Sequence, residues 1–269
     1  MNDGVILCNG EFPKKDYPLY LLKSADVIVC CDSALNVRRL EKLGLRPDVI
    51  VGDMDSTPEA IQEKYSDRLV RVAEQDDNDL AKAFALMRER FPEVTDIHIL
   101  GAGGKNEAHT VGNLGWLMEW ERRSLEETGL GLAARGIKVE MVSDWSTAFA
   151  VSPDHSPSPS AASPCPSSPC PSSPCPSSSC HSDASPCHSD ASPCHSERSE
   201  ESLTLHVGTG RKMSFFATDP DLHLRSEGLQ WPLDGADLTR WWAATLNRAT
   251  ADAVTLRFSR PAPLLVILD

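Results

Sequence analysis

Short apolar runs rich in valine and isoleucine alternate with helical patterns over about the first 125 residues. Runs of this length, separated by turn residues and amphipathic helices, are typical of repeated βα units. Such strands are buried on both faces, so the pattern predicts a mostly parallel sheet covered by helices. The predicted strands are residues 5–8, 27–31, 49–51, 69–72 and 97–100.

Helix signals are clearest at three places after these strands. Thr57 is suited to the N-cap, and Pro58 to the first position, of a helix that continues to residue 65. Amphipathic patterns predict two further helices, over residues 79–91 and 109–120. Each of them follows one of the predicted strands, as a βα unit requires.

From Lys138 onward the pattern changes to short strands separated by turn residues, without a long helix. This pattern predicts a small antiparallel β domain after the parallel one. The predicted strands are residues 138–142, 147–151, 203–207, 212–217, 253–258 and 264–268.

Residues 152–202 interrupt this second domain with a different composition. Serine, proline, cysteine and histidine dominate, with PCPSS repeated three times and CHSDASP twice. Such a segment cannot bury enough apolar surface to offset the entropy of ordering, so we expect a disordered insertion that lengthens a hairpin loop. Six of the nine cysteines lie in it, at spacings that lack the CxxC pairs of a zinc site. The others, Cys8, Cys30 and Cys31, lie in apolar runs, where we expect small buried side chains.

Composition and charge narrow the range of partners. The chain has 269 residues, of which 41% are hydrophobic and 24% are charged, as in an ordinary soluble protein. Its net charge of -13 repels nucleic acid and anionic membrane surfaces, so a phosphate ligand would need a metal ion. No apolar run approaches the roughly 20 residues of a membrane span, and the first residues lack the features of a signal peptide. We therefore expect a cytoplasmic protein with neither nucleic acid nor membrane as a partner.

Acidic or glycine-rich segments follow four of the predicted strands. Asp32 follows the second strand, and Asp53 and Asp55 follow the third. The segment EQDDNDLAK follows the fourth strand, and GAGGKNEAH follows the fifth. Ligands of open parallel sheets bind at the carboxyl ends of the strands, so these segments together predict one site. Any one of them alone is also compatible with a helix cap or a solvated loop.

Asp53, Asp55 and Asp79 are the candidate ligands of a Mg²⁺ ion in this site. Asp53 and Asp55 are alternate residues at a strand end, so we expect them to point to the same side. Mg²⁺ prefers oxygen ligands and usually keeps water and substrate phosphates. Lys82, one turn into the next helix, is placed to hold a phosphate, and the glycines of segment 101–104 allow backbone N–H groups to approach it. The glycine spacing matches neither the P-loop nor the dinucleotide-binding motif.

In their order along the chain, these segments resemble the thiamin pyrophosphokinase family. The family pattern of an Asp-Gly-Ala turn, PDxIxGDxDS, QDxTDxxK and GxxGRxDH is met by CDSALN, PDVIVGDMDS, QDDNDLAK and GAGGKNEAH. Near the end of the chain, SEGLQWPL and WWAATLN resemble the family's GLxWxL segment and its closing Ser/Thr-x-Asn. The resemblance spans nearly the whole chain outside residues 152–202.

The resemblance implies a fold, a reaction and an assembly. The implied fold is α/β, with an N-terminal, mostly parallel, Rossmann-like domain over residues 1–130 and a small antiparallel β-sandwich domain over residues 136–269. The implied reaction is the Mg²⁺-dependent transfer of a pyrophosphoryl group from ATP to thiamin, which gives thiamin diphosphate and AMP. The implied assembly is a homodimer in which thiamin lies near the subunit boundary.

The resemblance also assigns roles to individual residues. Lys82 matches a catalytic residue on the nucleotide side. Trp231 matches the aromatic residue that stacks on thiamin, with core packing as the alternative, and Asn247 matches a polar contact in the same pocket. The residues that match the Mg²⁺-associated carboxylates are Asp53, Asp55 and Asp79. The residues expected to bind ATP are Asp32, Gln75, Asp76, Gly101, Gly104 and His109.

Two departures from the family pattern lie in the segment GAGGKNEAH. Asn106 stands where the family has Arg, and Ala108 stands where it has an Asp of the reacting cluster. Glu107 is one residue away and is expected to point elsewhere. Two other hypotheses therefore stay open: a weakened or inactive homologue that binds thiamin or nucleotide, and a related diphosphokinase that acts on a pterin alcohol. Trp231 and the segment around Asn247 favour thiamin over the pterin.

Overall fold

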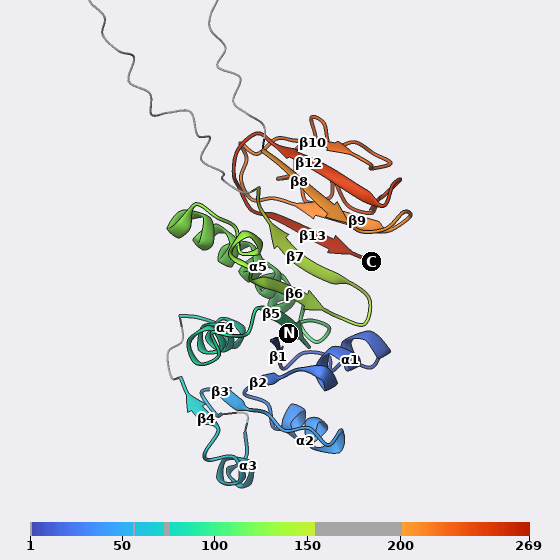
Figure 1. Ribbon diagram of the computed structural model, residues 1–269. Helices are drawn as coiled ribbons and strands as arrows, with labels where there is room; N and C mark the ends of the chain where they lie inside the picture. Colours follow the sequence, from blue (N-terminus) through green and yellow to red (C-terminus); the bar gives the residue numbers. More distant parts are fainter. Residues whose placement is uncertain (1, 56, 73–75, 154–200) are drawn as a thin grey trace, which may run out of the picture. The chain divides into compact units, whose positions relative to one another are not determined.

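The computed structural model describes residues 2–55, 57–72, 76–153 and 201–269. Strands and helices alternate along the chain as far as a long helix, α5 (Figure 1). These elements are β1 (Asp3–Leu7), α1 (Asp16–Ser24), β2 (Val27–Cys31), α2 (Ala34–Lys42), β3 (Val49–Gly52), α3 (Glu59–Lys64), β4 (Leu69–Arg71), α4 (Asp79–Arg90), β5 (Asp96–Leu100) and α5 (Glu107–Thr128). A short 3-10 helix and a series of strands follow α5. They are η1 (Ala133–Arg135), β6 (Lys138–Val142), β7 (Thr147–Val151), β8 (Glu201–His206), β9 (Lys212–Phe216), β10 (Leu224–Glu227), β11 (Asn247–Arg248), β12 (Ala253–Phe258) and β13 (Leu264–Leu268).

Six strands pair in parallel, in the order β6-β5-β1-β2-β3-β4. Alternate residues of these strands face opposite helical layers, because side chains of a strand point to the two faces of the sheet in turn. Val5 and Leu7 belong to a cluster with apolar residues of α1 and α2. Ile6 and Val29 belong to a second cluster, with apolar residues of α4 and α5. The prediction of a parallel sheet with helices on both faces is therefore confirmed.

The antiparallel strands continue the same sheet. β7 pairs antiparallel with β6, and β13, β9 and β11 follow, so that ten strands form one sheet. A separate three-stranded sheet has the order β10-β12-β8. Buried side chains of the two sheets, among them Phe215 from β9 and Leu256 from β12, share one apolar cluster. The predicted small antiparallel domain is confirmed, and one of its layers is an extension of the parallel sheet.

The strands that flank the repetitive segment do not form a hairpin. β7 lies in the ten-stranded sheet, whereas β8 pairs with β12 in the three-stranded sheet. The prediction that the segment lengthens a hairpin loop is therefore wrong, because the chain passes from one sheet to the other at this point. Residues 154–200, which hold nearly all of the predicted insertion, lie outside the described residues. Cys8, Cys30 and Cys31 are buried, as expected.

The three predicted helices differ from the observed ones at their ends, α4 only in that it ends one residue early, at Arg90. α3 begins at Glu59 with Pro58 as its N-cap, so the assignment of Thr57 to the cap is wrong by one residue. The Thr57 hydroxyl instead donates a hydrogen bond to Asp32 Oδ1. α5 is longer than the amphipathic pattern predicted and ends where Gly129 takes a left-handed conformation with φ of 72°. Within the described ranges, no helix has both the length and the hydrophobicity that a membrane span requires.

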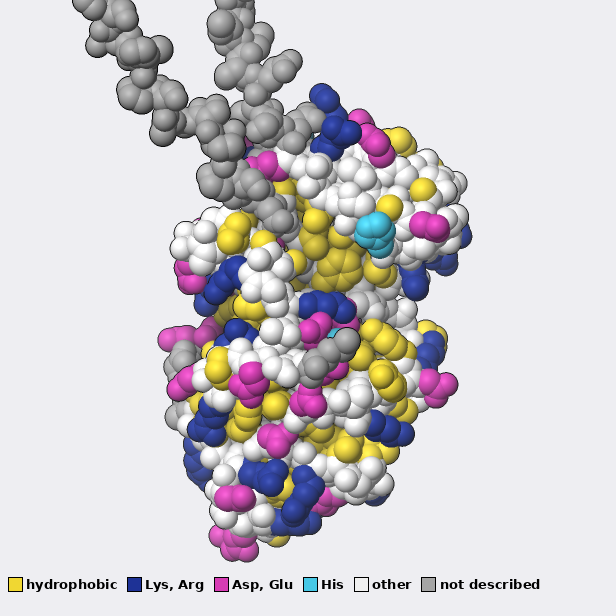
Figure 2. Space-filling view, viewed as in Figure 1, with side chains coloured by type: hydrophobic (Ala, Val, Ile, Leu, Met, Phe, Trp, Pro, Cys, Tyr) yellow, Lys and Arg dark blue, Asp and Glu magenta, His cyan; other side chains and the backbone are white. Residues whose placement is uncertain are grey.

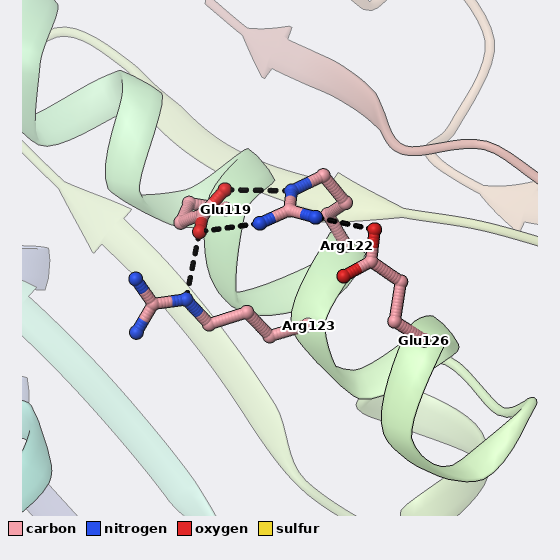
Figure 3. A network of polar contacts seen from close by, with 4 residues as sticks. All are labelled: Glu119, Arg122, Arg123 and Glu126. Atoms are coloured by element: carbon pink, nitrogen blue, oxygen red, sulfur yellow. Dashed lines mark hydrogen bonds and ion pairs between the residues drawn. The ribbon is translucent and has the colours of Figure 1, made fainter.

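The exposed side of α5 carries a network of charged side chains (Figure 3). Arg122 donates to both carboxylate oxygens of Glu119, at 2.8 and 2.7 Å, and also to Glu126. Arg123 Nε donates to Glu119 Oε1 at 2.7 Å. These residues are three or four positions apart, so they are neighbours on the helix surface, and their pairing supports the second half of α5.

Candidate functional site

A cavity of about 560 Å³ lies where the loops after the parallel strands meet. Its wall combines acidic side chains from the end of β3 and the start of α4 with the loops after β1 and β5. The carboxyl ends of parallel strands share one edge of a sheet, which brings these distant segments together. The cavity is lined by Cys8, Asn9, Gly10, Cys31, Asp53, Asp76, Asp77, Asn78, Asp79, Leu80, Lys82, Gly101, Ala102, Gly103, Lys105, Asn106, His109 and Asn113.

Asp53 and Asp55 have different surroundings. Asp53 lines the cavity, whereas Asp55 is exposed and is not among the lining residues. Met54 between them has φ of 71°, so the backbone is not extended at this point. The Asp55 backbone N–H donates to Asp53 Oδ1 at 3.1 Å and fixes this turn. The expectation that both carboxylates point the same way depended on an extended strand end, which the chain does not have here.

Asp79 is the first residue of α4 and lines the cavity, where it is exposed to solvent. Asn78 is the N-cap of this helix, and its Oδ1 accepts a hydrogen bond from the Ala81 backbone N–H at 2.9 Å. The pKa of Asp79 is raised, mainly because partial desolvation disfavours its charged form, and the carboxylates of Asp53 and Asp32 add to this effect. Lys82 opposes it. A carboxylate that lies close to other carboxylates favours a bound cation, which relieves their repulsion.

The donor set of the cavity fits a magnesium ion that arrives with phosphates. Asp53, Asp76 and Asp79 supply carboxylate oxygens, which Mg²⁺ prefers. Across the described residues, no three His, Cys, Asp or Glu side chains are gathered into a ready-made metal cage. Mg²⁺ does not require one, because it commonly takes one or two carboxylates and completes its shell with water and substrate phosphates.

Glycines allow the loops after β1 and β5 to pack backbone against backbone. The Gly10 N–H donates to the Gly101 carbonyl at 2.6 Å, and the Glu11 N–H donates to the Gly103 carbonyl at 2.7 Å. A Cβ atom on Gly10 would lie 2.2 Å from the Gly101 oxygen, so only glycine fits there. Gly101 lines the cavity, but Gly104 lines two neighbouring pockets instead.

Three polar residues of the cavity were missed by sequence reasoning. Asn113 is buried in α5; its Nδ2 donates to the Ala102 carbonyl at 2.8 Å, and its Oδ1 accepts from Asn78 Nδ2 at 3.0 Å. Lys105 Nζ donates to the backbone oxygen of Asn9 at 2.8 Å and to Asn9 Oδ1 at 3.2 Å. The position of Asn113, four residues after His109 on the same helix face, was a usable signal. Asn9 and Lys105 had none, because each lies in an irregular loop.

The two departures from the family pattern lie at the start of α5. Asn106 is the N-cap of this helix, and its Oδ1 accepts a hydrogen bond from the His109 backbone N–H at 3.2 Å. Asn106 lines the cavity, but neither Glu107 nor Ala108 does. Both are exposed in the first turn. No carboxylate from the first turn of α5 therefore lines the cavity.

Of the other residues predicted to bind ATP, some line the cavity and others do not. Asp76 and His109 line the cavity. Asp32 is buried, is hydrogen bonded to Thr57 and is not among the lining residues. Gln75 lies outside the described residues.

Trp231 and Asn247 form a separate arrangement in the antiparallel region. Asn247 is buried; its Nδ2 donates to the Trp231 carbonyl at 2.6 Å, and its Oδ1 accepts from the Trp231 N–H at 3.2 Å. Trp231 itself is exposed, with 56% of the residue accessible to solvent. Neither residue lines the acidic cavity. Asn247 thus fixes the backbone on which an exposed aromatic ring is presented.

Comparisons with known proteins match both regions of the chain. Residues 19–127 match the family model of the thiamin pyrophosphokinase catalytic domain, and residues 198–260 match that of the thiamin pyrophosphokinase substrate-binding domain. No curated protein matches the chain.

Solved structures of similar fold include three thiamin pyrophosphokinases. The enzyme from Geobacillus thermodenitrificans has 17% identity and a TM-score of 0.62, over 99% of this chain and 96% of the other. The enzyme from Bacillus subtilis has 17% identity and a TM-score of 0.61, over 99% of this chain and 98% of the other. The yeast enzyme has 15% identity and a TM-score of 0.63, over 100% of this chain and 86% of the other. At these identities the structures establish a shared fold.

Proposed function

This chain belongs to the thiamin pyrophosphokinase family, and we propose that it transfers the pyrophosphoryl group of ATP to the hydroxyl group of thiamin. The products are thiamin diphosphate and AMP. One observation carries the proposal: Asp53, Asp79 and Lys82 line the same cavity as the glycine loop that begins at Gly101. Carboxylates for a metal, a cation for phosphate and close backbone N–H groups are what transfer of a phosphoryl-type group requires.

Asp53 and Asp79 are the residues that would hold Mg²⁺, and Asp76 lines the same cavity. We retain Asp55 as a candidate because its backbone is bonded to Asp53. Bound Mg²⁺ supplies charge neutralisation at the phosphate oxygens, which makes the β-phosphorus open to attack.

Lys82 and the glycine loop orient the nucleotide. Lys82 lies one turn into α4 and provides a point charge for a phosphate oxygen. Lys105 adds a second cation to the cavity wall, one residue before Asn106, where the family pattern has Arg. We assign Asp76, His109 and Gly101, which line the cavity, to the nucleotide side. For Gln75, Asp32 and Gly104 the same assignment depends on the family resemblance alone, because Gln75 lies outside the described residues and the other two do not line the cavity.

Trp231 and Asn247 are proposed to bind thiamin. The flat, cationic thiazolium ring of thiamin is attracted to an aromatic face, and the Trp231 ring is exposed on a backbone that Asn247 holds. Because these residues do not line the acidic cavity of their own chain, we propose a homodimer in which thiamin lies between subunits.

The direct test incubates purified full-length protein with ATP, Mg²⁺ and thiamin and measures AMP and thiamin diphosphate, with EDTA as the control. Formation of both products in equal amounts only with Mg²⁺ is the expected result. Product from a pterin alcohol but not from thiamin would support the diphosphokinase alternative.

A second candidate function, a homologue that binds without turnover, is favoured by the missing carboxylate at Ala108. If this second candidate is correct, calorimetric titration will show binding of thiamin and an ATP analogue, whereas the assay will show no product. Ala108→Asp restores the family carboxylate and is expected to raise turnover at least about tenfold. Ala108→Asn, of the same size but uncharged, is the matched control, and equal rates for both variants would argue against a carboxylate role at this position.

A further inference from the structure

A second pocket, of about 520 Å³, lies beside the acidic cavity and has the opposite charge. Three separate segments form it: the loop after β1, the last turn of α2 and the loop after β5. We call it the cationic pocket, and its lining residues are Glu11, Phe12, Lys14, Arg39, Lys42, Leu43, Gly104 and Lys105.

Positive charge in this pocket is left largely uncompensated. Its single carboxylate, Glu11, forms an ion pair with Lys14 at 2.6 Å. Among the described residues, neither Arg39 nor Lys42 has a carboxylate within ion-pair distance, and Lys105 is bonded only to the neutral oxygens of Asn9. A surplus of three positive charges in a chain of net charge -13 makes this the place where an anion is attracted.

The helix dipole does not account for this arrangement. Arg39 and Lys42 lie in the last turn of α2, where cations interact favourably with the negative end of the helix. That effect explains cations on α2, but it does not bring Lys14 and Lys105 to the same pocket from two other loops. Convergence of the four from separate segments is typical of a site that binds an anionic ligand.

The wall of the pocket also has an apolar part. The Arg39 guanidinium carbon lies 5.1 Å from the centre of the half-buried Phe12 ring, and Leu43 is 36% exposed beside it. A guanidinium stacked on a ring keeps its N–H groups directed along its own plane, where they can bind phosphate oxygens in pairs. The volume lies within the range of pockets that bind small molecules.

We propose that the cationic pocket binds an organic phosphate, in which Arg39 and Lys42 hold the phosphoryl oxygens and Phe12 and Leu43 contact a flat apolar group. The ligand chemistry is that of a nucleoside monophosphate or a similar ester. The cationic pocket adjoins the acidic cavity and shares Lys105 with it. The two sites differ because the carboxylates of the cavity need a metal ion before they can accept phosphate, whereas the cationic pocket does not.

The test measures binding of AMP to the full-length protein by calorimetry, in EDTA so that metal-dependent binding in the acidic cavity is absent. The double variant Arg39→Ala/Lys42→Ala is expected to weaken AMP binding at least about tenfold. The matched control Lys23→Ala/Arg38→Ala removes the same charge from exposed positions of α1 and α2 outside the pocket and is expected to bind AMP like the wild type.

Inorganic pyrophosphate tests the binding of phosphate separately from the contact with a flat apolar group, because pyrophosphate has no such group. Phe12→Leu is expected to weaken AMP binding several-fold and to leave pyrophosphate binding unchanged. If circular dichroism shows that the double variant is unfolded, the AMP affinity of Phe12→Leu is the test of the pocket instead. Absence of AMP binding at millimolar concentration in EDTA would overturn the proposal. Equal weakening by the pocket variant and its control would do the same, and an unchanged AMP affinity in Phe12→Leu would overturn the organic part. No turnover is measured, so these outcomes stand whether or not the protein makes thiamin diphosphate.

Discussion

The parallel and antiparallel strands share one ten-stranded sheet, yet the two regions expose different chemistry. Every residue of β2 is buried, and the acidic residues of the cavity lie in the segments that follow the parallel strands. β8 alternates partly buried and exposed residues, and three tryptophans of the antiparallel region, Trp231, Trp241 and Trp242, are about half or more exposed. On the face shown in Figure 2, charges of both signs are scattered over the helical part, and hydrophobic side chains gather near the antiparallel strands.

This difference follows from how each kind of sheet is covered. Parallel strands are buried on both faces, which favours polar side chains in the segments at the two edges. Glu140 of β6 and His98 of β5 are exceptions: both are buried, with Glu140 Oε1 2.9 Å from His98 Nδ1. Antiparallel strands leave one face accessible, which can carry flat aromatic groups. Charge for phosphate and aromatic surface for an organic ring are thus supplied by different regions of one sheet.

The largest expected effect tests whether the two regions fold as one unit. Phe215 is 1% exposed in the core of the antiparallel region, and Phe215→Ala is expected to lower the free energy of unfolding by about 3–5 kcal/mol. Because β6 and β7 pair within one sheet, tryptophan fluorescence and far-ultraviolet circular dichroism should shift together in urea. Trp242→Ala, at a residue that is 76% exposed, is the control. Two separate transitions would show that the regions are independent.

The next effect concerns the acidic cavity. Asp79→Asn removes a carboxylate from the start of α4 and is expected to reduce turnover about 10²–10³-fold, because a preorganised charge is lost where the phosphates bind. Calorimetry should show a matching loss of Mg²⁺-dependent ATP binding. Asp67→Asn, at an exposed acid outside the cavity, serves as the control. Unchanged binding and turnover in Asp79→Asn would remove Asp79 from the site.

A smaller effect is expected from the residue that holds Trp231. Asn247→Ala removes two hydrogen bonds to the Trp231 backbone and should cost about 1–3 kcal/mol of unfolding free energy. It should also raise the KM for thiamin while Mg²⁺-dependent ATP binding is kept, which would separate the two regions functionally. The exposed neighbour Gln230 provides the control variant Gln230→Ala. A matching loss of ATP binding would contradict the separation.

The smallest expected effect is a pH dependence of stability that arises from Glu119 on α5, which lines neither the acidic cavity nor the cationic pocket. Hydrogen bonds from Arg122 hold the pKa of Glu119 down at about 2 in the folded chain, below its ordinary value of 4.5. The stabilisation is complete above pH 4.5 and is lost as pH falls towards 2. The stability difference between wild type and Glu119→Gln should therefore shrink over this range, by less than about 1 kcal/mol. A difference that is constant with pH would contradict the assignment.

Most of the fold could be predicted because its elements are local patterns. The predicted strand at 27–31 agrees with β2 at both ends, and the start of α4 at Asp79 also agrees. The wrong N-cap of α3 has a tertiary cause, since Thr57 is bonded to Asp32 instead of capping its own helix. The hairpin around the insertion was wrong because the pairing partners of β7 and β8 are distant in the chain.

The sequence predicted where the candidate site lies better than it predicted which residues line it. Asp53, Asp79 and Lys82 line one cavity, as the position of their segments after parallel strands indicated. Asn9 and Lys105 belong to the cavity through irregular loops, for which no periodic pattern exists. The roles of all these residues in binding remain predictions.

The sequence by itself determined the alternation of strands and helices in the first region, most strands of the second region, and the edge at which the acidic and glycine-rich segments gather, because hydrophobic period and turn residues are properties of neighbouring positions. It did not indicate β10 and β11. Only the tertiary structure decided which carboxylates face the cavity and that the two regions share one sheet. The first depends on the left-handed backbone at Met54, and the second depends on the pairing of β6 with β7. Both depend on contacts that form only in the folded chain, so a local sequence pattern does not predict them.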